Sequence, residues 1–476
     1  MRTPIADFVK QYTEADMSRF HMPGHKGRAS SLGCEPFDLT EVAGADALCE
    51  AGGIIAESEA NATVLFGSGH TFYSAEGSSL CIRAMIFLTV QAWRQKQGDA
   101  RPVILAARNA HKAFLYACAL TDTDVHWLYP EERFANNEAG PASICSCPIT
   151  PETAEAAILE ELERGGSLPA ALYVTSPDYL GGRQDLPALA ALCRRYGIPL
   201  LVDNAHGAYL KFLPKPCHPM DLGAAMCCDS AHKTLPVLTG GAYLHIAKDF
   251  LPDSLTAVRQ SLSLFGSTSP SYLVLQSLDL CNAALSGSWP ARLAETVAAL
   301  DTLKANLRAL GYTVASAEPL KLTILTADAY SGDDLADALR AFRVECEHSD
   351  SESCIFMISP ENSSRDLERL EASLREVAPQ FLSSAASSAT DFTTSSSCGA
   401  SYRPVFLPAP VRMSIRDAVF APSELLSPEE ALGRICATPV VSCPPAIPIA
   451  VSGEEITKNT VRLFRHYGIE TVRVVL

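Results

Sequence analysis

The sequence lacks the features of several broad classes of protein. It contains no basic stretch, and 54 acidic residues against 38 basic ones give a net charge of −16. Because a nucleic-acid binder must neutralise phosphates with Lys and Arg, we expect no nucleic-acid partner. The amino-terminal residues form no basic and apolar signal segment, and no apolar run reaches the roughly 18 residues of a membrane span. The sequence therefore predicts a cytoplasmic protein that does not enter a membrane.

Cysteines at the spacing of a zinc site are also absent. The chain has 16 cysteines but no Cys-x-x-Cys pair, so no metal site is predicted. In a long chain without a secretory signal, cysteines within apolar runs are expected to be small buried hydrophobic residues rather than disulfide partners. Those in such runs are Cys81, Cys118, Cys193, Cys227 and Cys228.

The chain is long and apolar enough for a globular protein of several domains. Its 476 residues exceed what one core usually holds, and 47% of them are hydrophobic. From about residue 45 to 250, short apolar runs alternate with amphipathic stretches, such as 153–164 and 186–196, that have helical spacing. Strands are expected at 103–106, 170–174, 198–202, 224–228 and 241–246. This alternation predicts an α/β fold with a mostly parallel sheet covered on both faces, and functional groups at the carboxyl ends of its strands.

The rest of the sequence indicates further units. A second α/β region has helical patterns at 271–282 and 292–310 and strand-like runs at 320–325 and 354–358. A Ser-, Thr- and Ala-rich stretch then predicts an exposed linker, and the last unit ends in a strand over 471–475. The predicted division is an amino-terminal arm (1–45), a large cofactor domain (46–254), a small α/β domain (255–380), a linker (381–401) and a small carboxy-terminal α+β domain (402–476).

Lys233 points most directly to a chemistry. It lies between two strand-like apolar runs, where a free ammonium would be costly to bury. A Schiff base with an aldehyde cofactor would remove that cost and make the lysine a nucleophilic catalyst. Asp203 ends an earlier strand and suits the protonated ring nitrogen of pyridoxal phosphate. Lys233 or Asp203 alone is weak evidence for such a site. Together with the adjacent Ser230 and His232, the two residues favour a pyridoxal-phosphate site.

The phosphate of this cofactor needs an anion-binding cradle. Gly77, Ser78 and Ser79 precede an apolar run with helical spacing. Free N–H groups at the start of such a helix, with two hydroxyl groups, suit a dianionic phosphate. An ordinary serine helix cap is the competing interpretation, and for this motif alone it is the commoner outcome.

Five ordered motifs make the chain similar to the Orn/Lys/Arg decarboxylase family. The sequence Ser-Ala-His-Lys-Thr-Leu-Pro around Lys233 resembles the lysine motif of that family. The other four are His-Met-Pro-Gly-His-Lys-Gly at 21–27, Ala-Arg-Asn-Ala-His-Lys at 107–112, Phe-Gly-Ser-Thr-Ser-Pro-Ser-Tyr at 265–272 and Cys-Pro-Pro-Ala-Ile-Pro at 443–448. The resemblance implies an aspartate-aminotransferase-like fold (fold type I) for most of the chain. It is greatest to compact biosynthetic-type members, which have no amino-terminal receiver-like domain.

The resemblance also implies roles for individual residues. Lys233 would carry the cofactor, Asp203 would pair with its ring nitrogen, and His111 would stack on the ring. Ala205 would pack on the opposite ring face, with His206 near the phenolic oxygen. The phosphate would be held by Ser78, Ser79, Ser230 and His232, and by Ser267 and Ser269 of the neighbouring subunit. A homodimer with shared active sites is therefore expected, and further assembly stays open.

Four positions depart from the family pattern. Glu76 stands before the phosphate loop where asparagine is usual, and Asp178 stands where threonine is usual. These two acidic residues could alter the cofactor site or its entrance. Cys443 and Ala446 replace a common tyrosine and glycine in the terminal motif. They bear on the choice of substrate, because the terminal domain borders the entrance in relatives.

The implied reaction is decarboxylation of a basic amino acid to an amine and carbon dioxide, which would supply polyamine synthesis. The substrate would displace Lys233, lose its carboxylate, and be protonated at Cα by His232 or Lys233. Arginine, lysine and ornithine all stay open as substrates. One alternative is an aminotransferase or a lyase of the same fold, which would lack the 21–27 segment and the terminal domain. The other is an inert binding protein, against which the intact Lys233, Asp203 and His111 argue.

Overall fold

A seven-stranded sheet forms the centre of the computed structural model, which describes residues 1–28, 32–130, 143–250, 255–315, 318–326, 330–388, 407–441 and 446–476. Its strands are β1 (His70–Ser74), β2 (Val103–Ala107), β3 (Asp124–Leu128), β4 (Ala171–Thr175), β5 (Leu200–Asp203), β6 (Met226–Asp229) and β7 (Ala242–Ile246). Their order is β1-β7-β6-β5-β4-β2-β3, and β7 runs antiparallel to both of its neighbours. The other neighbouring pairs are parallel. The predicted mostly parallel α/β sheet is confirmed.

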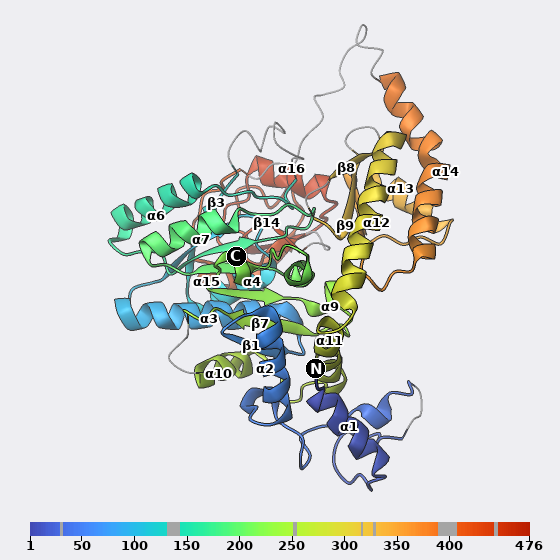
Figure 1. Ribbon diagram of the computed structural model, residues 1–476. Coiled ribbons are helices and arrows are strands. Elements are labelled where there is room, and N and C mark those ends of the chain that lie inside the picture. Colours follow the sequence, from blue (N-terminus) through green and yellow to red (C-terminus); the bar gives the residue numbers. More distant parts are fainter. Residues whose placement is uncertain are drawn as a thin grey trace.

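Helices cover both faces of this sheet (Figure 1). They are α2 (Ile54–Phe66), α3 (Gly77–Gln97), α4 (Lys112–Thr121), α6 (Pro151–Gly165), α7 (Leu186–Tyr196) and α11 (Tyr272–Leu285). Outside them, α1 (Pro4–Glu14) packs on α2 and α11, and α10 (Leu255–Phe265) packs on α3. Because side chains alternate along a strand, Tyr173 of β4 packs in the core with α3 and α4, whereas Leu172 packs in the core with α6 and α7. A third core joins β1 and β7 to α1, α2 and α11.

Short helical segments occupy several connections around the sheet. They are η1 (Glu35–Phe37), η2 (Leu48–Glu50), η3 (Ala208–Phe212), α8 (Pro219–Leu222) and α9 (Ala231–Thr234). Two of them matter for the site, because η3 follows β5 and α9 follows β6. The cysteines predicted to be buried and unpaired, Cys81, Cys118, Cys193, Cys227 and Cys228, are buried and free.

A second, four-stranded antiparallel sheet lies beside the first (Figure 1). Its strands are β8 (Thr313–Ala315), β9 (Lys321–Leu325), β10 (His348–Ser349) and β11 (Ser353–Met357), in the order β10-β11-β9-β8. It packs with α12 (Trp289–Leu310), α13 (Gly332–Arg340) and α14 (Ser364–Ser388). Because α14 continues to Ser388, the first part of the predicted linker is helical. The rest of that linker, from residue 389, lies outside the described residues.

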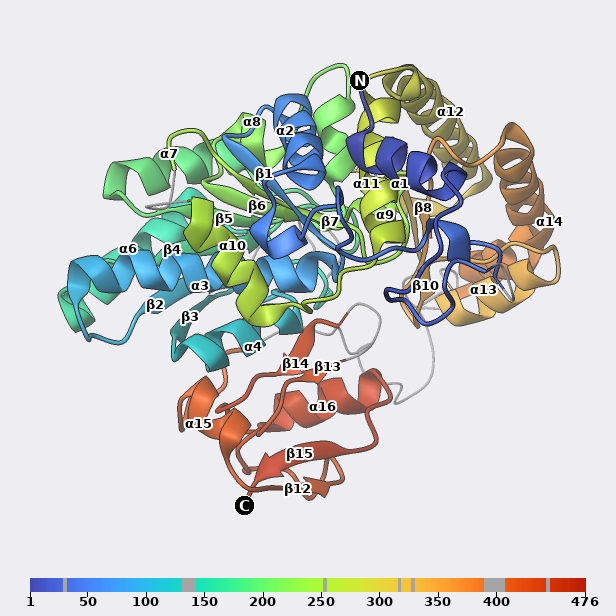
Figure 2. The same ribbon diagram turned by 90° about the horizontal axis from the view of Figure 1, so that it is seen from below.

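The carboxy-terminal residues form a small α+β unit against α4 (Figure 2). It contains α15 (Ile415–Phe420), β12 (Ser423–Leu426), β13 (Val440–Val441), β14 (Pro448–Ala450), α16 (Lys458–His466) and β15 (Val472–Val475). β12 pairs with β15 and β13 pairs with β14, both antiparallel. The predicted final strand at 471–475 is confirmed as β15.

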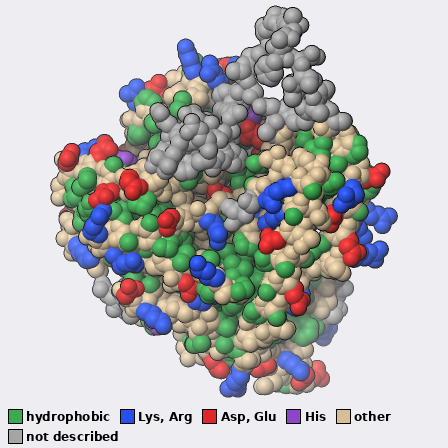
Figure 3. All heavy atoms as spheres, turned by 45° about the horizontal axis from the view of Figure 1, so that its top comes forward, with side chains coloured by type: hydrophobic (Ala, Val, Ile, Leu, Met, Phe, Trp, Pro, Cys, Tyr) green, Lys and Arg blue, Asp and Glu red, His purple; other side chains and the backbone are tan. Residues whose placement is uncertain are grey.

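On the face drawn in Figure 3, the described surface has no patch formed by charges of one sign alone. There, Lys and Arg side chains are interspersed with Asp and Glu side chains. None of the helices that the structure describes is both long and apolar enough to cross a membrane.

Candidate active site

A cavity of about 440 Å³ opens at the carboxyl ends of β4, β5 and β6. The carboxyl ends of parallel strands meet at one edge of a sheet, which is where ligands of such folds bind. Its lining includes Ser78, Ser79, His111, Asp203, Ala205, His206, Ser230, His232 and Lys233, all predicted from the sequence. Ser267 and Ser269, also predicted, are exposed and do not line it.

Lys233 lies in α9, between the buried strands β6 and β7. The flanking strands are buried as predicted, but Lys233 itself is exposed to the cavity, so the expectation of a buried lysine was wrong. Its Nζ lies 3.1 Å from His206 Nε2. Desolvation by the surrounding protein atoms lowers the pKa of Lys233, although Asp203 acts in the opposite direction.

Asp203 ends β5 and is 3% exposed. Its Oδ1 accepts hydrogen bonds from Ala205 N at 3.2 Å and from Cys228 Sγ at 3.7 Å. Its Oδ2 accepts one from Tyr173 OH at 3.3 Å. All three donors are neutral groups, so the charge of the carboxylate stays available to a cationic partner in the cavity.

Two histidines of the lining have defined tautomers. His111, the N-cap of α4, accepts a hydrogen bond from Ala113 N at Nδ1, so the hydrogen of the neutral ring is on Nε2. Burial lowers the pKa of His111 to about 4, so the ring is neutral at neutral pH. His232 Nδ1 lies 3.0 Å from Gly241 O, which can only accept, so this nitrogen carries the hydrogen. Burial also lowers the pKa of His232, which leaves its Nε2 without a proton.

The start of α3 has the properties of an anion cradle. No side chain caps this helix of 21 residues, and although Gly77 N donates to Gly240 O at 2.7 Å, the next N–H groups, of Ser78 and Ser79, stay open to a ligand. The hydroxyl groups of Ser78 and Ser230 are joined by a hydrogen bond of 2.8 Å at this point. Glu76 departs from the family pattern and adds a negative charge beside the cradle. Its carboxylate accepts a hydrogen bond from Ser267 N. Its carboxylate is therefore occupied at the rim of the cavity.

The other departures have simpler outcomes. Asp178 is buried, does not line the cavity, and accepts a hydrogen bond from Gly182 N at 2.6 Å within its own turn. Ala446 lines the cavity with a φ of 59°, a left-handed conformation that explains why glycine suits this position. Cys443 lies outside the described residues.

The lining also has polar residues that the sequence did not single out. Thr175 Oγ1 and Asn109 Oδ1 are buried and have no hydrogen-bond partner among the described residues. Such orphaned atoms in a cavity wall fit a bound polar molecule, as pyridoxal phosphate is. The end of a predicted parallel strand could have identified Thr175. Glu347 also lines the cavity but comes from the second sheet region, so no local pattern indicated it.

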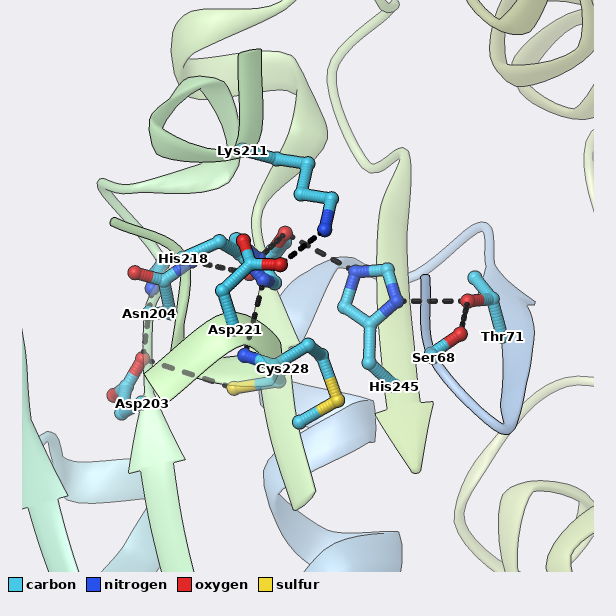
Figure 4. A network of polar contacts seen from close by, with 12 residues as sticks. Ser68, Thr71, Asp203, Asn204, Lys211, His218, Asp221, Cys228 and His245 are labelled. Carbon is cyan, nitrogen blue, oxygen red and sulfur yellow. Dashed lines mark hydrogen bonds and ion pairs between the residues drawn. The ribbon is translucent and has the colours of Figure 1, made fainter. Parts of the chain in front are cut away.

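A fully buried network supports the strand ends that carry the site (Figure 4). Asp229, the last residue of β6, receives hydrogen bonds from Asn204 at 2.7 Å, His218 at 2.9 Å and His245 at 3.1 Å. Burial alone would raise the pKa of Asp229, but the two histidines lower it overall. Because His218 Nδ1 accepts a backbone N–H, its Nε2 carries a hydrogen and is a donor rather than a metal ligand. The network therefore ties β5 to β6.

The carboxy-terminal unit completes the wall beside His111. Arg108 Nη1 donates to Pro448 O at 2.7 Å, and Lys112 N donates to Ala446 O at 3.2 Å. These contacts bring Ala446 and Ile447 into the lining. The position of this wall therefore depends on the segment around His111.

Comparisons with known proteins agree with this geometry. The model of the Orn/Lys/Arg decarboxylase major domain matches residues 3–331. The arginine decarboxylase of Bacillus subtilis (strain 168) is 30% identical over 488 residues, which cover 96% of this chain and 92% of that protein. The arginine decarboxylase of Halalkalibacterium halodurans is 28% identical over 493 residues, covering 98% and 93%.

Solved structures show the fold. The constitutive lysine decarboxylase of E. coli matches with a TM-score of 0.76 and 17% identity, over 100% of this chain and 81% of that chain. The fold-type-I architecture expected from the sequence is thereby confirmed. The chain belongs to the Orn/Lys/Arg decarboxylase family, whose members are pyridoxal-phosphate-dependent amino-acid decarboxylases.

Proposed function

We propose that this enzyme decarboxylates arginine, with Glu347 as the residue that meets the cationic end of the substrate. The observation that carries the proposal is that Glu347 and Lys233 line one cavity. Of the carboxylates there, Asp203 is held by neutral donors at the base and Glu76 is engaged with Ser267. Glu347 is exposed, and Tyr179 OH donates to it at 3.4 Å. The two full-length relatives named above as arginine decarboxylases favour arginine over lysine and ornithine.

The lining residues would hold pyridoxal phosphate in the following way. The start of α3 with Ser78, Ser79, Ser230 and His232 would hold the phosphate. Asp203 would accept a hydrogen bond from the protonated ring nitrogen, and His111 and Ala205 would confine the ring between them. When bound, the cofactor supplies an aldehyde for covalent attachment of amines and a ring that accepts an electron pair.

The residues of this chain would control protons and orientation. Asp203 would keep the ring nitrogen protonated by its charge. Lys233, once its amine has taken up a proton from the incoming substrate ammonium, is better suited than His232 to return one to Cα. The reason is that His232 Nδ1–H is bound to Gly241 O and its Nε2 has no proton to give. Thr175 and Asn109 could orient polar groups of the bound molecules with their unpartnered atoms.

The test is carbon dioxide release from arginine, lysine and ornithine, compared side by side with added cofactor. We expect turnover with arginine, and an increase in KM for arginine of about fivefold in Glu347→Gln, as for an exposed ion pair worth about 1 kcal/mol. Glu345→Gln is the matched control, because Glu345 is exposed two residues away and pairs with Arg340. Preference for lysine or ornithine, or an unchanged KM in Glu347→Gln, would contradict the proposal.

We further propose a cytoplasmic homodimer in which Ser267 and Ser269 reach the phosphate of the neighbouring subunit. Their exposure and their absence from the lining of their own cavity support this arrangement. A mixture of Lys233→Ala chains with Ser267→Ala/Ser269→Ala chains should regain activity, because one hybrid site then carries neither defect. A fully active monomer in sedimentation under assay conditions would exclude the shared site.

A further inference from the structure

A lysine outside the cavity lining lies against the far side of His206. Lys321 is in β9 of the second sheet and is 3% exposed. Its Nζ lies 3.4 Å from His206 Nδ1, while His206 Nε2 lies 3.1 Å from Lys233 Nζ. The imidazole of His206 therefore stands between two lysine amines, one on each ring nitrogen.

The other partners of Lys321 determine its charge. Its Nζ lies 3.0 Å from the buried carboxylate of Glu318, 3.3 Å from Asp178 O and 3.2 Å from Tyr179 O. The two carbonyl oxygens accept hydrogen bonds from the amine, whereas the carboxylate of Glu318 meets it as an ion pair. A buried carboxylate in contact with the amine favours its charged form. Lys321 is therefore an ammonium.

The charge of Lys321 decides which nitrogen of His206 carries a hydrogen. An ammonium has no lone pair, so Nδ1 can meet it only as an acceptor. Desolvation, together with the two lysines, lowers the pKa of His206 well below its usual range, so the ring is neutral. Its single hydrogen is then on Nε2 and points toward Lys233. A hydrogen bond forms there only if Lys233 offers a lone pair, which a protonated amine does not have.

We propose that Lys321 is a positioning residue that, through the tautomer of His206, holds Lys233 as a neutral amine ready to attack an aldehyde. The proposal rests on the proposed function in one respect, namely that Lys233 carries the cofactor. The protonation states that it assigns to His206 and Lys233 are those of the chain before any cofactor is bound. Without the ammonium of Lys321, His206 could place its hydrogen on either nitrogen, and Lys233 would gain a proton more readily.

Other titratable groups face the same pair of residues. Desolvation lowers the pKa of Lys233, Asp203 raises it, Lys321 lowers it, and Glu347 and Cys228 raise it. His111 and His232 also oppose protonation of His206. Lys321 is the one among these residues that does not belong to the cavity lining or to β6. Its replacement therefore changes the electrostatics of Lys233 without removing a group from the cavity.

The experiment measures how fast the cofactor-free, full-length chain combines with pyridoxal phosphate from pH 6 to 10. Borohydride trapping and peptide mass locate the linkage at Lys233. In Lys321→Met the midpoint of the pH profile should move up by about one unit, so combination at neutral pH should slow about tenfold. Lys321→Arg keeps the charge and should keep the midpoint near that of the wild type.

Lys304→Met is the matched control. Lys304 is also 3% exposed, and its Nζ donates to Glu318 O at 2.9 Å and lies 3.4 Å from Pro319 O, on the loop that carries Glu318. It has no contact with His206, so its removal should leave the midpoint unchanged. A midpoint that does not move in Lys321→Met, or that moves equally in Lys304→Met, would overturn the proposal.

A second measurement tests the proposal in the wild-type chain, so it does not depend on whether a Lys321 variant folds. In the wild-type chain with 15N-labelled histidine, the ring of His206 should show an unprotonated Nδ1 and a protonated Nε2, with His206→Gln identifying the signals. A hydrogen on Nδ1 would refute the proposal. Both measurements use the cofactor-free chain. A chain that shows the pH shift but decarboxylates no basic amino acid would therefore refute the proposed function alone.

Discussion

Replacing Arg108 by methionine should loosen the carboxy-terminal wall of the cavity. The guanidinium donates to Pro448 O at 2.7 Å and to Ile449 O at 3.2 Å, and lies 3.5 Å from the carboxylate of Glu454. Arg108 and Glu454 are 3% and 4% exposed. Methionine fills similar space but removes the donor for both carbonyls and leaves the buried carboxylate without this cation.

The magnitude follows from the burial of the pair. Removing one member of a buried ion pair costs about 3 to 5 kcal/mol in the free energy of unfolding. Burial already raises the pKa of Glu454, against the effect of Arg108, and its carboxylate keeps a hydrogen bond of 3.1 Å from Val451 N. Without Arg108 the carboxyl group can take up a proton and avoid an isolated charge. We therefore expect a loss near the lower limit, about 3 kcal/mol.

The assay is urea unfolding followed by circular dichroism, with carbon dioxide release measured in parallel. Adding Glu454→Gln to Arg108→Met should restore part of the stability, because no charge is then buried alone. Arg416→Met is the matched control: Arg416 of α15 also donates to carbonyls of α4, but it pairs with no buried carboxylate among the described residues, and the expected loss is under about 1 kcal/mol. A loss under 1 kcal/mol in Arg108→Met, or full additivity in the double variant, would refute the reasoning.

Further predictions concern the cavity itself. Lys233→Ala should abolish turnover and the borohydride-trapped linkage of the cofactor while leaving the circular dichroism unchanged; a retained linkage would contradict its assignment. Asp203→Asn should reduce turnover by orders of magnitude, beyond any loss of cofactor occupancy measured by absorbance. Ala446→Gly should raise the free energy of unfolding by about 0.5 kcal/mol, because the left-handed backbone strain disappears. The pKa of His111 is lowered from 6.5 to about 4 on folding, so its contribution to stability is complete above pH 6.5 and is lost as the pH falls through about 4. Urea midpoints between pH 7 and pH 4 should therefore fall more steeply in the wild type than in His111→Asn.

The central strands could be predicted from the sequence because both faces of each are buried. β4 and β5 lie within two residues of the predicted runs, since unbroken apolar stretches are typical of covered parallel strands. β1 and β3 escaped prediction because they are edge strands with polar residues, such as His70 and Asp124, at their starts. Without a continuous apolar run, periodicity does not identify such a strand.

The cavity was predictable to the extent that its residues lie in local motifs at strand ends. Asp203 and Lys233 follow this rule, since each lies at or just after the end of a neighbouring strand. Lys321 and Glu347 lie in no such motif, because the second sheet region brings them to the site. Lys321 contacts a ring nitrogen of His206, which lies 115 positions earlier in the sequence. No spacing in the sequence records such a contact, which is set by the packing of one sheet against the other.

Glu76 departs from the family pattern without directing its charge into the phosphate cradle, and it also contacts the segment that carries Ser267. A carboxylate beside a phosphate cradle would repel the phosphate if it pointed inward. Here it accepts the backbone hydrogen of Ser267, at the start of the segment that is proposed to reach the neighbouring subunit. The same side chain therefore withdraws its charge from the cradle and fixes the position of Ser267. If the shared site exists, Glu76 therefore acts on the phosphate of the neighbouring subunit, because it holds the backbone of Ser267 in place.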